Sequence, residues 1–192
     1  MLSIIARKWS KVIVPADADS DAREICTYGI ELALYTFIST AGLFLIGVMA
    51  GKPLETLLLI SIYYTNQTFG GGYHATTHIR CFLVMSMGLI ISLSVLEAPW
   101  NHEILCGICT ISYLYLWRRP LQLHPNKRYL QGQKSRLIRR SHLIATILYL
   151  LVMIMTITGS SLSVSGTLGM IVSAVSRMAG VHLNQQSRSA ND

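Results

Sequence analysis

A short polar stretch, residues 70–81, interrupts a chain that is otherwise strongly apolar. It reads GGGYHATTHIRC and contains two histidines, His74 and His78, before a thiol at Cys81. A cysteine attacks a carbonyl as its thiolate, and neighbouring cations such as a histidinium or an arginine favour that form. The residue types therefore predict nucleophilic catalysis at Cys81, with a histidine as base and Arg80 as a supporting cation.

The spacing of this stretch predicts a bend in the chain. His74 and Cys81 are seven residues apart, which in one unbroken helix is about 10.5 Å along the axis and too far for direct proton transfer. The run Gly70, Gly71, Gly72 permits unusual φ values and close backbone approach, so we predict a hinge there. The glycines would end one helix, a loop would carry His74 inward, and Cys81 would open the next helix. His78, three residues before Cys81, can share a helical face with it and is a competing base.

The same residues permit a metal alternative. His74, His78 and Cys81 form the pattern H-x-x-x-H-x-x-C, a possible three-ligand zinc face. However, HATTH lacks the glutamate of the H-E-x-x-H metallopeptidase motif, and no carboxylate lies close in sequence. A second pair, Cys106 and Cys109, lies inside an apolar run, where cysteine behaves as a small hydrophobic residue. We therefore expect free thiols, no metal and no cofactor.

The composition indicates a membrane protein. Hydrophobic residues make up 52% of the 192 residues and charged residues 13%, about half the usual share in soluble proteins. The net charge of +7 could suggest nucleic acid, but several runs of lipid-spanning length argue against such a partner. The expected partner surface is the lipid bilayer.

Six apolar runs are candidates for membrane-spanning helices, which need about 17 to 25 residues. These runs are residues 32–50, 54–69, 81–96, 104–117, 142–158 and 162–176. We predict an all-α integral membrane protein with six transmembrane helices. It would form one membrane domain over 1–192, with an interfacial segment 1–27, a helical core 28–176 and a tail 177–192. Glycine and serine in the last run would allow close helix packing.

The basic residues predict the orientation. With six spans, every lysine and arginine except Lys52 falls on one side, which the positive-inside rule assigns to the cytoplasm. Both termini and the 70–81 stretch would then lie at the cytoplasmic face of a bacterial cell membrane. The basic loop 118–140 would fix this topology. Its cations could also bind an acidic substrate, the candidates being Arg118, Arg119, Lys127 and Arg128.

The first residues predict an amphipathic helix. Leu2, Ile5, Trp9 and Val12 recur at helical spacing, while the nearby basic residues lie largely off that stripe. Such a helix can lie on the anionic cytoplasmic leaflet or pack on the protein's own surface.

Two polar residues near the end of the second run, Asn66 and Gln67, are costly in lipid and predicted to face the protein interior. Either could orient the imidazole or bind a substrate carbonyl. A small transporter or channel is a further alternative for a six-span chain. Against it, no charged residue lies at mid-span, and no two-half repeat is evident.

The segment GGYHA at residues 71–75, followed by RCF at 80–82, resembles the signature of the accessory gene regulator B (AgrB) family. The basic amphipathic start, the span count and the loop segment HPNKRYL are also similar. The resemblance implies a membrane cysteine endopeptidase of bacterial quorum sensing. Such an enzyme cuts an AgrD-like propeptide near its C-terminal side and yields a cyclic thiolactone or lactone.

The same resemblance implies roles for individual residues. Cys81 would be the nucleophile and His74 its base, whereas His78 is not required by the family pattern. The family usually has a basic residue ahead of the glycines. Here that region reads Asn66-Gln67-Thr68, so the corresponding role would fall to Gln67. The resemblance, with the small residues of the last run, also suggests a homodimer.

Overall fold

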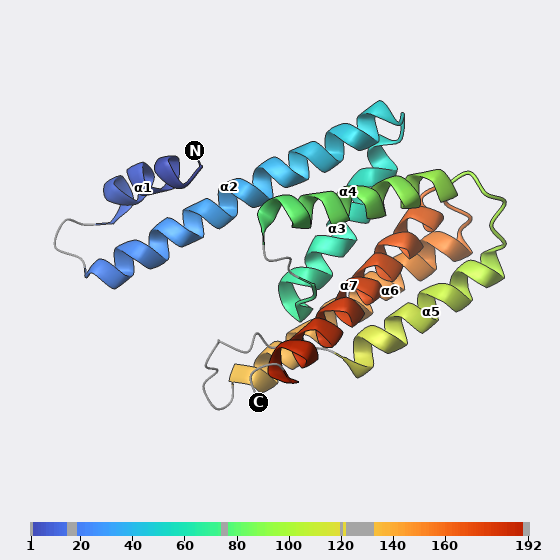
Figure 1. Ribbon diagram of the computed structural model, residues 1–192. Helices are drawn as coiled ribbons and strands as arrows, with labels where there is room; N and C mark the ends of the chain where they lie inside the picture. The colour runs from blue at the N-terminus through green and yellow to red at the C-terminus, as the bar shows by residue number, and fades with distance from the viewer. Residues whose placement is uncertain (1, 15–18, 74–76, 120, 122–132, 190–192) are drawn as a thin grey trace. The chain divides into compact units, whose positions relative to one another are not determined.

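The chain is entirely helical over the residues that the structure describes. The computed structural model describes residues 2–14, 19–73, 77–119, 121 and 133–189, with the side chains of residues 3–14, 19–73, 77, 79–119, 121 and 133–181. In these ranges there are seven helices and no strand (Figure 1). They are α1 (Leu2–Ile13), α2 (Ser20–Met49), α3 (Pro53–Gly70), α4 (His78–Val95), α5 (His102–Arg118), α6 (Gln133–Ile157) and α7 (Ser163–Ser189).

Each of the six predicted apolar runs coincides with a helix to within one residue at its ends, or lies inside one, so the all-α prediction is confirmed. Helices α2, α6 and α7 extend well beyond the predicted runs; α6 takes in part of the basic loop, and α7 continues through Ser189. The structure divides into two compact units, Met1–Leu45 and Ile46–Asp192. The single membrane domain expected from the sequence therefore stays a prediction.

Among the described residues, three helices are long and apolar enough to cross a membrane, namely Ser20–Met49, Gln133–Ile157 and Ser163–Val181. Ile79–Val95 is apolar but shorter. Helices α3 and α5 fall short of this composition because they carry polar residues, and several of these, including Thr56, Asn66 and Ser112, are buried. The number of spans and the side of each terminus stay predictions.

In the first unit, α1 turns small residues toward α2. Ala6 and Ser10 are buried, and the Thr27 hydroxyl of α2 donates a hydrogen bond to Ser10 Oγ at 2.7 Å. The predicted apolar stripe remains exposed at Ile5, Trp9 and Val12. The amphipathic helix is thus present, with an apolar surface available to a lipid interface.

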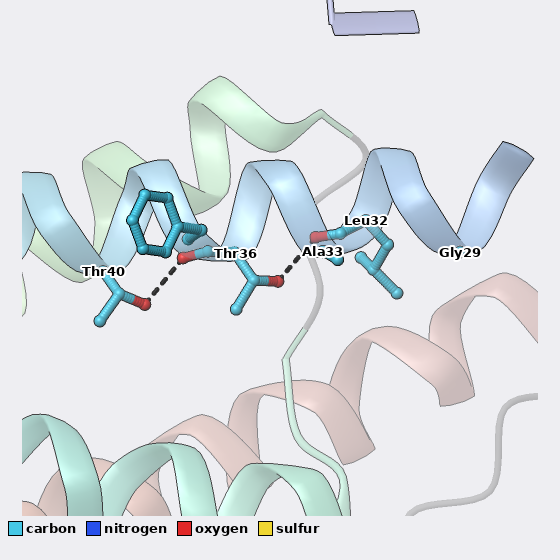
Figure 2. A pocket seen from close by; sticks show the side chains of 6 residues that line it. Gly29, Leu32, Ala33, Thr36 and Thr40 are labelled. Carbon is cyan, nitrogen blue, oxygen red and sulfur yellow. Dashed lines mark hydrogen bonds between the residues drawn. The ribbon is translucent and has the colours of Figure 1, made fainter. Parts of the chain in front are cut away.

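An open apolar groove runs along α2 in the same unit. Figure 2 shows its lining, which is Gly29, Leu32, Ala33, Thr36, Phe37 and Thr40. The hydroxyls of Thr36 and Thr40 donate to carbonyls one turn earlier, at 2.8 and 2.7 Å. Since these polar atoms are satisfied within the helix, the groove presents a mainly apolar surface.

In the second unit, α7 is the central helix and packs against α3, α5 and α6 (Figure 1). Glycines allow this close approach. A Cβ built on Gly166 would lie 3.0 Å from Val152 of α6, and one built on Gly169 would lie 3.0 Å from Ile62 of α3. The small residues of the last run therefore serve packing within the chain, as their composition predicted. The homodimer stays a prediction.

Helices α5 and α6 are joined by paired hydroxyls and aromatic rings. Tyr113 contacts the Thr146 hydroxyl at 3.1 Å, and Tyr149 contacts the Thr110 hydroxyl at 3.1 Å. The two tyrosine rings stack with centroids 4.3 Å apart. These contacts satisfy polar groups between otherwise apolar helices, where an unpaired hydroxyl would be costly.

The second unit has two chemically different ends. Lys52, just before α3, forms an ion pair with Glu97 at 2.9 Å, and this contact lowers the pKa of the Glu97 carboxyl. Gly70 lies at the other end of α3, about 27 Å away along an 18-residue helix. That second end, called here the glycine-loop end, also has Arg80 near the start of α4 and Arg118 and Arg119 at the end of α5. The positive-inside rule places such basic residues on the cytoplasmic side, and the orientation of this end stays a prediction.

Candidate active site

Helix α3 ends at the three glycines, as the sequence predicts. Gly71 has a positive φ of 70° and donates its N–H to the Gln67 carbonyl at 2.9 Å, which is a helix C-terminal conformation that favours glycine. Gly70 and Gly72, on either side of Gly71, leave room for side chains that lie directly against their Cα atoms. A Cβ on Gly70 would lie 1.8 Å from Arg177 Nη2, and a Cβ on Gly72 would lie 2.1 Å from Gln67 Oε1.

The residue that follows the glycines is bonded to two helices. The Tyr73 N–H donates to Ser176 of α7. The Ser176 carbonyl oxygen lies 3.0 Å from the Tyr73 nitrogen, and the Ser176 hydroxyl oxygen lies 3.2 Å from it. The Tyr73 carbonyl accepts a hydrogen bond from Gln67 Nε2 of α3 at 3.1 Å. Both backbone polar groups of Tyr73 therefore have partners, so the described start of the loop is bonded to α3 and α7.

Cys81 lies on the first turn of α4. The helix begins at His78, three residues earlier than expected, because Thr77 acts as its N-cap: Thr77 Oγ1 accepts from the Arg80 N–H at 3.4 Å. The Cys81 N–H bonds to the Thr77 carbonyl at 3.1 Å, and its side chain is partly buried. Cys81 therefore lies at the N-terminal end of its helix, directly after the loop that follows the glycines.

The other predicted site residues lie in different surroundings. Asn66 is buried and turned toward α7, where its amide contacts the Met170 sulfur at 3.8 Å. Arg80, Arg118 and Arg119 are exposed at the glycine-loop end. His74, Lys127 and Arg128 fall outside the described residues, as does the side chain of His78. The pairing of His74 with Cys81 and the zinc alternative therefore both remain predictions.

The sequence reasoning missed a structural residue at this end, Arg177. It is 1% exposed, and its guanidinium donates to the carbonyls of Asn66 at 3.2 Å, Leu116 at 3.2 Å and Arg119 at 2.9 Å. These carbonyls belong to the C-terminal turns of α3 and α5, where a cation is favoured by the helix dipole. The signal was present in the spacing, because Arg177 continues the face of Gly166, Met170 and Ser173. The predicted domain boundaries instead place Arg177 at the start of the tail 177–192.

Replacing Gly70 with alanine is expected to destabilise the glycine-loop end. The backbone of this last helical residue tolerates alanine, but the added methyl would displace the Arg177 guanidinium. We expect the free energy of unfolding in detergent micelles to fall by about 1–3 kcal/mol, the usual range for overpacking. Gly88→Ala in α4 is the matched control, because nothing lies within 4 Å of its Cβ. That variant should be neutral or slightly more stable, and equal melting curves for both variants would contradict the packing argument.

The fold and this end together define a helical membrane protein with a cysteine held at a helix N-terminus beside a glycine-bounded loop. The chain belongs to the accessory gene regulator B family, whose sequence model matches residues 6–177. It is also 24% identical over 158 residues to a Clostridium perfringens (strain SM101 / Type A) protein described as AgrB-like, a match that covers 77% of this chain and 72% of the relative. No solved structure matches it. This match confirms the resemblance seen in the 71–82 segment and indicates a role in the agr quorum-sensing system.

Proposed function

We propose that this protein is a membrane cysteine endopeptidase that cuts an AgrD-like propeptide and closes the N-terminal product into a ring. The observation that carries this proposal is the placement of Cys81. It lies on the first turn of α4, directly after a loop whose entry is bonded to α3 and α7. Family membership supplies the substrate class, a short quorum-sensing propeptide.

The proposed reaction has two acyl transfers. His74 takes the Cys81 proton, and the sulfur attacks the scissile carbonyl carbon; the C–N bond breaks as His74 returns the proton to the leaving amine. The N-terminal part is then a thioester on Cys81. A thiol or hydroxyl within the same peptide attacks that carbonyl, its proton passes through His74 to the Cys81 sulfur, and the ring closes. No water or redox partner is consumed.

The glycine-loop end would face the cytoplasm in this proposal, with six spans and both termini inside. Arg118 and Arg119, exposed near the end of α5, would attract an acidic peptide tail, together with Lys127 and Arg128. The exposed stripe of α1 at Ile5, Trp9 and Val12 would hold that helix on the cytoplasmic leaflet.

The test is cleavage by the purified chain in liposomes, using a synthetic propeptide with an internal cysteine and an acidic C-terminal tail. Mass spectrometry should detect a released tail and an N-terminal product lighter by one water than the hydrolysis product. Alkylation of Cys81 should prevent both. A chelator should leave the rate unchanged, whereas loss with the chelator and recovery with zinc would favour the metallopeptidase. A linear product alone would contradict the cyclisation step.

A further inference from the structure

The contacts of Ser176 close a ring of hydrogen bonds around the loop entry. Ser176 Oγ donates to Gln67 Oε1 at 3.3 Å, Gln67 Nε2 donates to the Tyr73 carbonyl at 3.1 Å, and the Tyr73 N–H returns to Ser176. The ring thus joins α7, α3 and the residue immediately before His74. Gly72 is part of the same arrangement, since a Cβ there would lie 2.1 Å from the Gln67 oxygen and 2.8 Å from Ser176 Oγ.

The donors and acceptors of this ring can be assigned from its chemistry. A serine hydroxyl has one proton to donate and two lone pairs to accept with. Because the Ser176 proton goes to Gln67, the 3.4 Å contact between Ser176 Oγ and Tyr63 OH has the tyrosine as donor. Ser176 then uses its full hydrogen-bonding capacity on Tyr63, Gln67 and Tyr73. A fully satisfied polar group in a mostly apolar interior fixes its partners more firmly than an exposed one.

Tyr63 adds a further residue to these contacts. Its aromatic ring is buried on α3, and its hydroxyl contacts Ser176 Oγ at 3.4 Å. Ser176 is also bonded to the residue that directly precedes His74. Tyr73 leads to His74 across a single peptide bond with a Cα–Cα distance of about 3.8 Å. Tyr63, which contacts the same hydroxyl, lies on the helix that leads into the loop.

We infer that Ser176 is a positioning residue for the reaction and that Tyr63 and Gln67 act through it. This inference rests on the proposed function. The Ser176 hydroxyl would fix the position of Tyr73, and so the point at which the chain enters the loop that carries His74. A small displacement of a catalytic base lowers the reaction rate much more than it weakens substrate binding. Loss of the hydroxyl should therefore lower kcat and leave KM nearly unchanged.

The experiment compares Ser176→Ala and Ser176→Thr with the unaltered chain in liposomes. We expect Ser176→Ala to lower kcat about tenfold, the scale of one or two lost hydrogen bonds, with KM changed less than about twofold. Ser176→Thr, which keeps a hydroxyl, should recover most of the rate. Ser173→Ala is the matched control one turn earlier, because the Ser173 hydroxyl is buried and donates only to the Gly169 carbonyl at 2.7 Å.

A second readout separates positioning from simple loss of structure. The rate of Cys81 alkylation by iodoacetamide, followed by mass spectrometry of the Cys81 peptide, is measured across pH. Replacing His74 with alanine should change this profile, and Ser176→Ala should shift it in the same direction, whereas Ser173→Ala should not. Gly72→Ala, which would displace the Gln67 amide, is a second variant that tests the same ring of hydrogen bonds. It should show the same fall in kcat and the same shift of the alkylation profile as Ser176→Ala. It also keeps the inference testable if Ser176→Ala does not fold.

The possible failures are distinguishable. If Ser176→Ala and Gly72→Ala keep the unaltered kcat and alkylation profile while Cys81→Ala is inactive, the role of Ser176 is overturned and the proposed function stands. If Cys81→Ala still cleaves, or if His74→Ala leaves the alkylation profile unchanged, the Cys–His mechanism itself is wrong. If the Ser173 control loses as much rate as Ser176→Ala, the effect comes from α7 packing, and the inference fails.

Discussion

Replacement of Cys81 by alanine is expected to abolish propeptide cleavage and ring formation, with a loss of at least about a thousandfold in rate. The physical reason is that no neighbouring group can take over formation of the thioester. Cys81→Ser should lose nearly as much, because a serine hydroxyl ionises far less readily than a thiol. The measurement is product formation in liposomes, followed by mass spectrometry over a range of enzyme concentrations.

Three controls make this result specific. His74→Ala should reduce the rate by about 10²–10⁴-fold, the usual contribution of a general base. His78→Ala should retain activity, since the family pattern does not require that histidine. Cys106→Ala should also retain activity, because this partly buried thiol lies within α5, away from the glycine loop. Retained cleavage by Cys81→Ala, or inactivity of His78→Ala, would contradict the assignment of nucleophile and base.

Replacement of Arg177 by methionine is expected to be strongly destabilising even though the side chains are similar in length. The change removes the donors to the carbonyls of Asn66, Leu116 and Arg119. The Leu116 carbonyl is buried and would lose its donor, at a cost of about 1–3 kcal/mol where no water replaces it, and the loss of the contacts to α3 and to Arg119 adds to this cost. We therefore expect the free energy of unfolding to fall by about 3 kcal/mol or more, seen as a lower melting temperature in detergent micelles.

The matched control for Arg177 is Arg139→Met, since Arg139 lies exposed on α6. That variant removes the same charge and should have the same melting temperature as the unaltered protein, because exposed charges contribute little to folding stability. Arg177→Lys should fall between the two, as an ammonium keeps the charge but loses the planar fork that reaches α3 and α5 together. Equal stability of Arg177→Met and Arg139→Met would show that the buried contacts do not hold these helices.

Much of the architecture follows from local pattern. The apolar runs predict the helices because each run must bury or shield its backbone polar groups in a bilayer, and a helix does this within one segment. Glycines 70–72 predict the end of α3, and the Leu2–Val12 stripe predicts α1. The segment GGYHA with Arg80 and Cys81 was enough to indicate the family, which the match over residues 6–177 confirms.

The exact residues at which helices begin and end are harder to predict from the sequence, because capping and packing decide them. The sequence placed Cys81 at the start of its helix, but Thr77 begins the helix earlier through its own side chain. The basic segment before residue 142 was expected to be a loop, yet α6 starts at Gln133. Lysine and arginine are good helix formers, so charge by itself does not end a helix.

The sequence alone determined the apolar helices, the family and the Cys81 motif, because each depends on residue type and near spacing. Only the tertiary structure decided what the glycines accommodate and what supports the loop. Arg177 and Ser176 lie more than 100 residues from their partners on α3, at Asn66 and Gln67. No local period links such distant residues. The reason Gly70 and Gly72 must be small is therefore visible only once α7 is packed against α3.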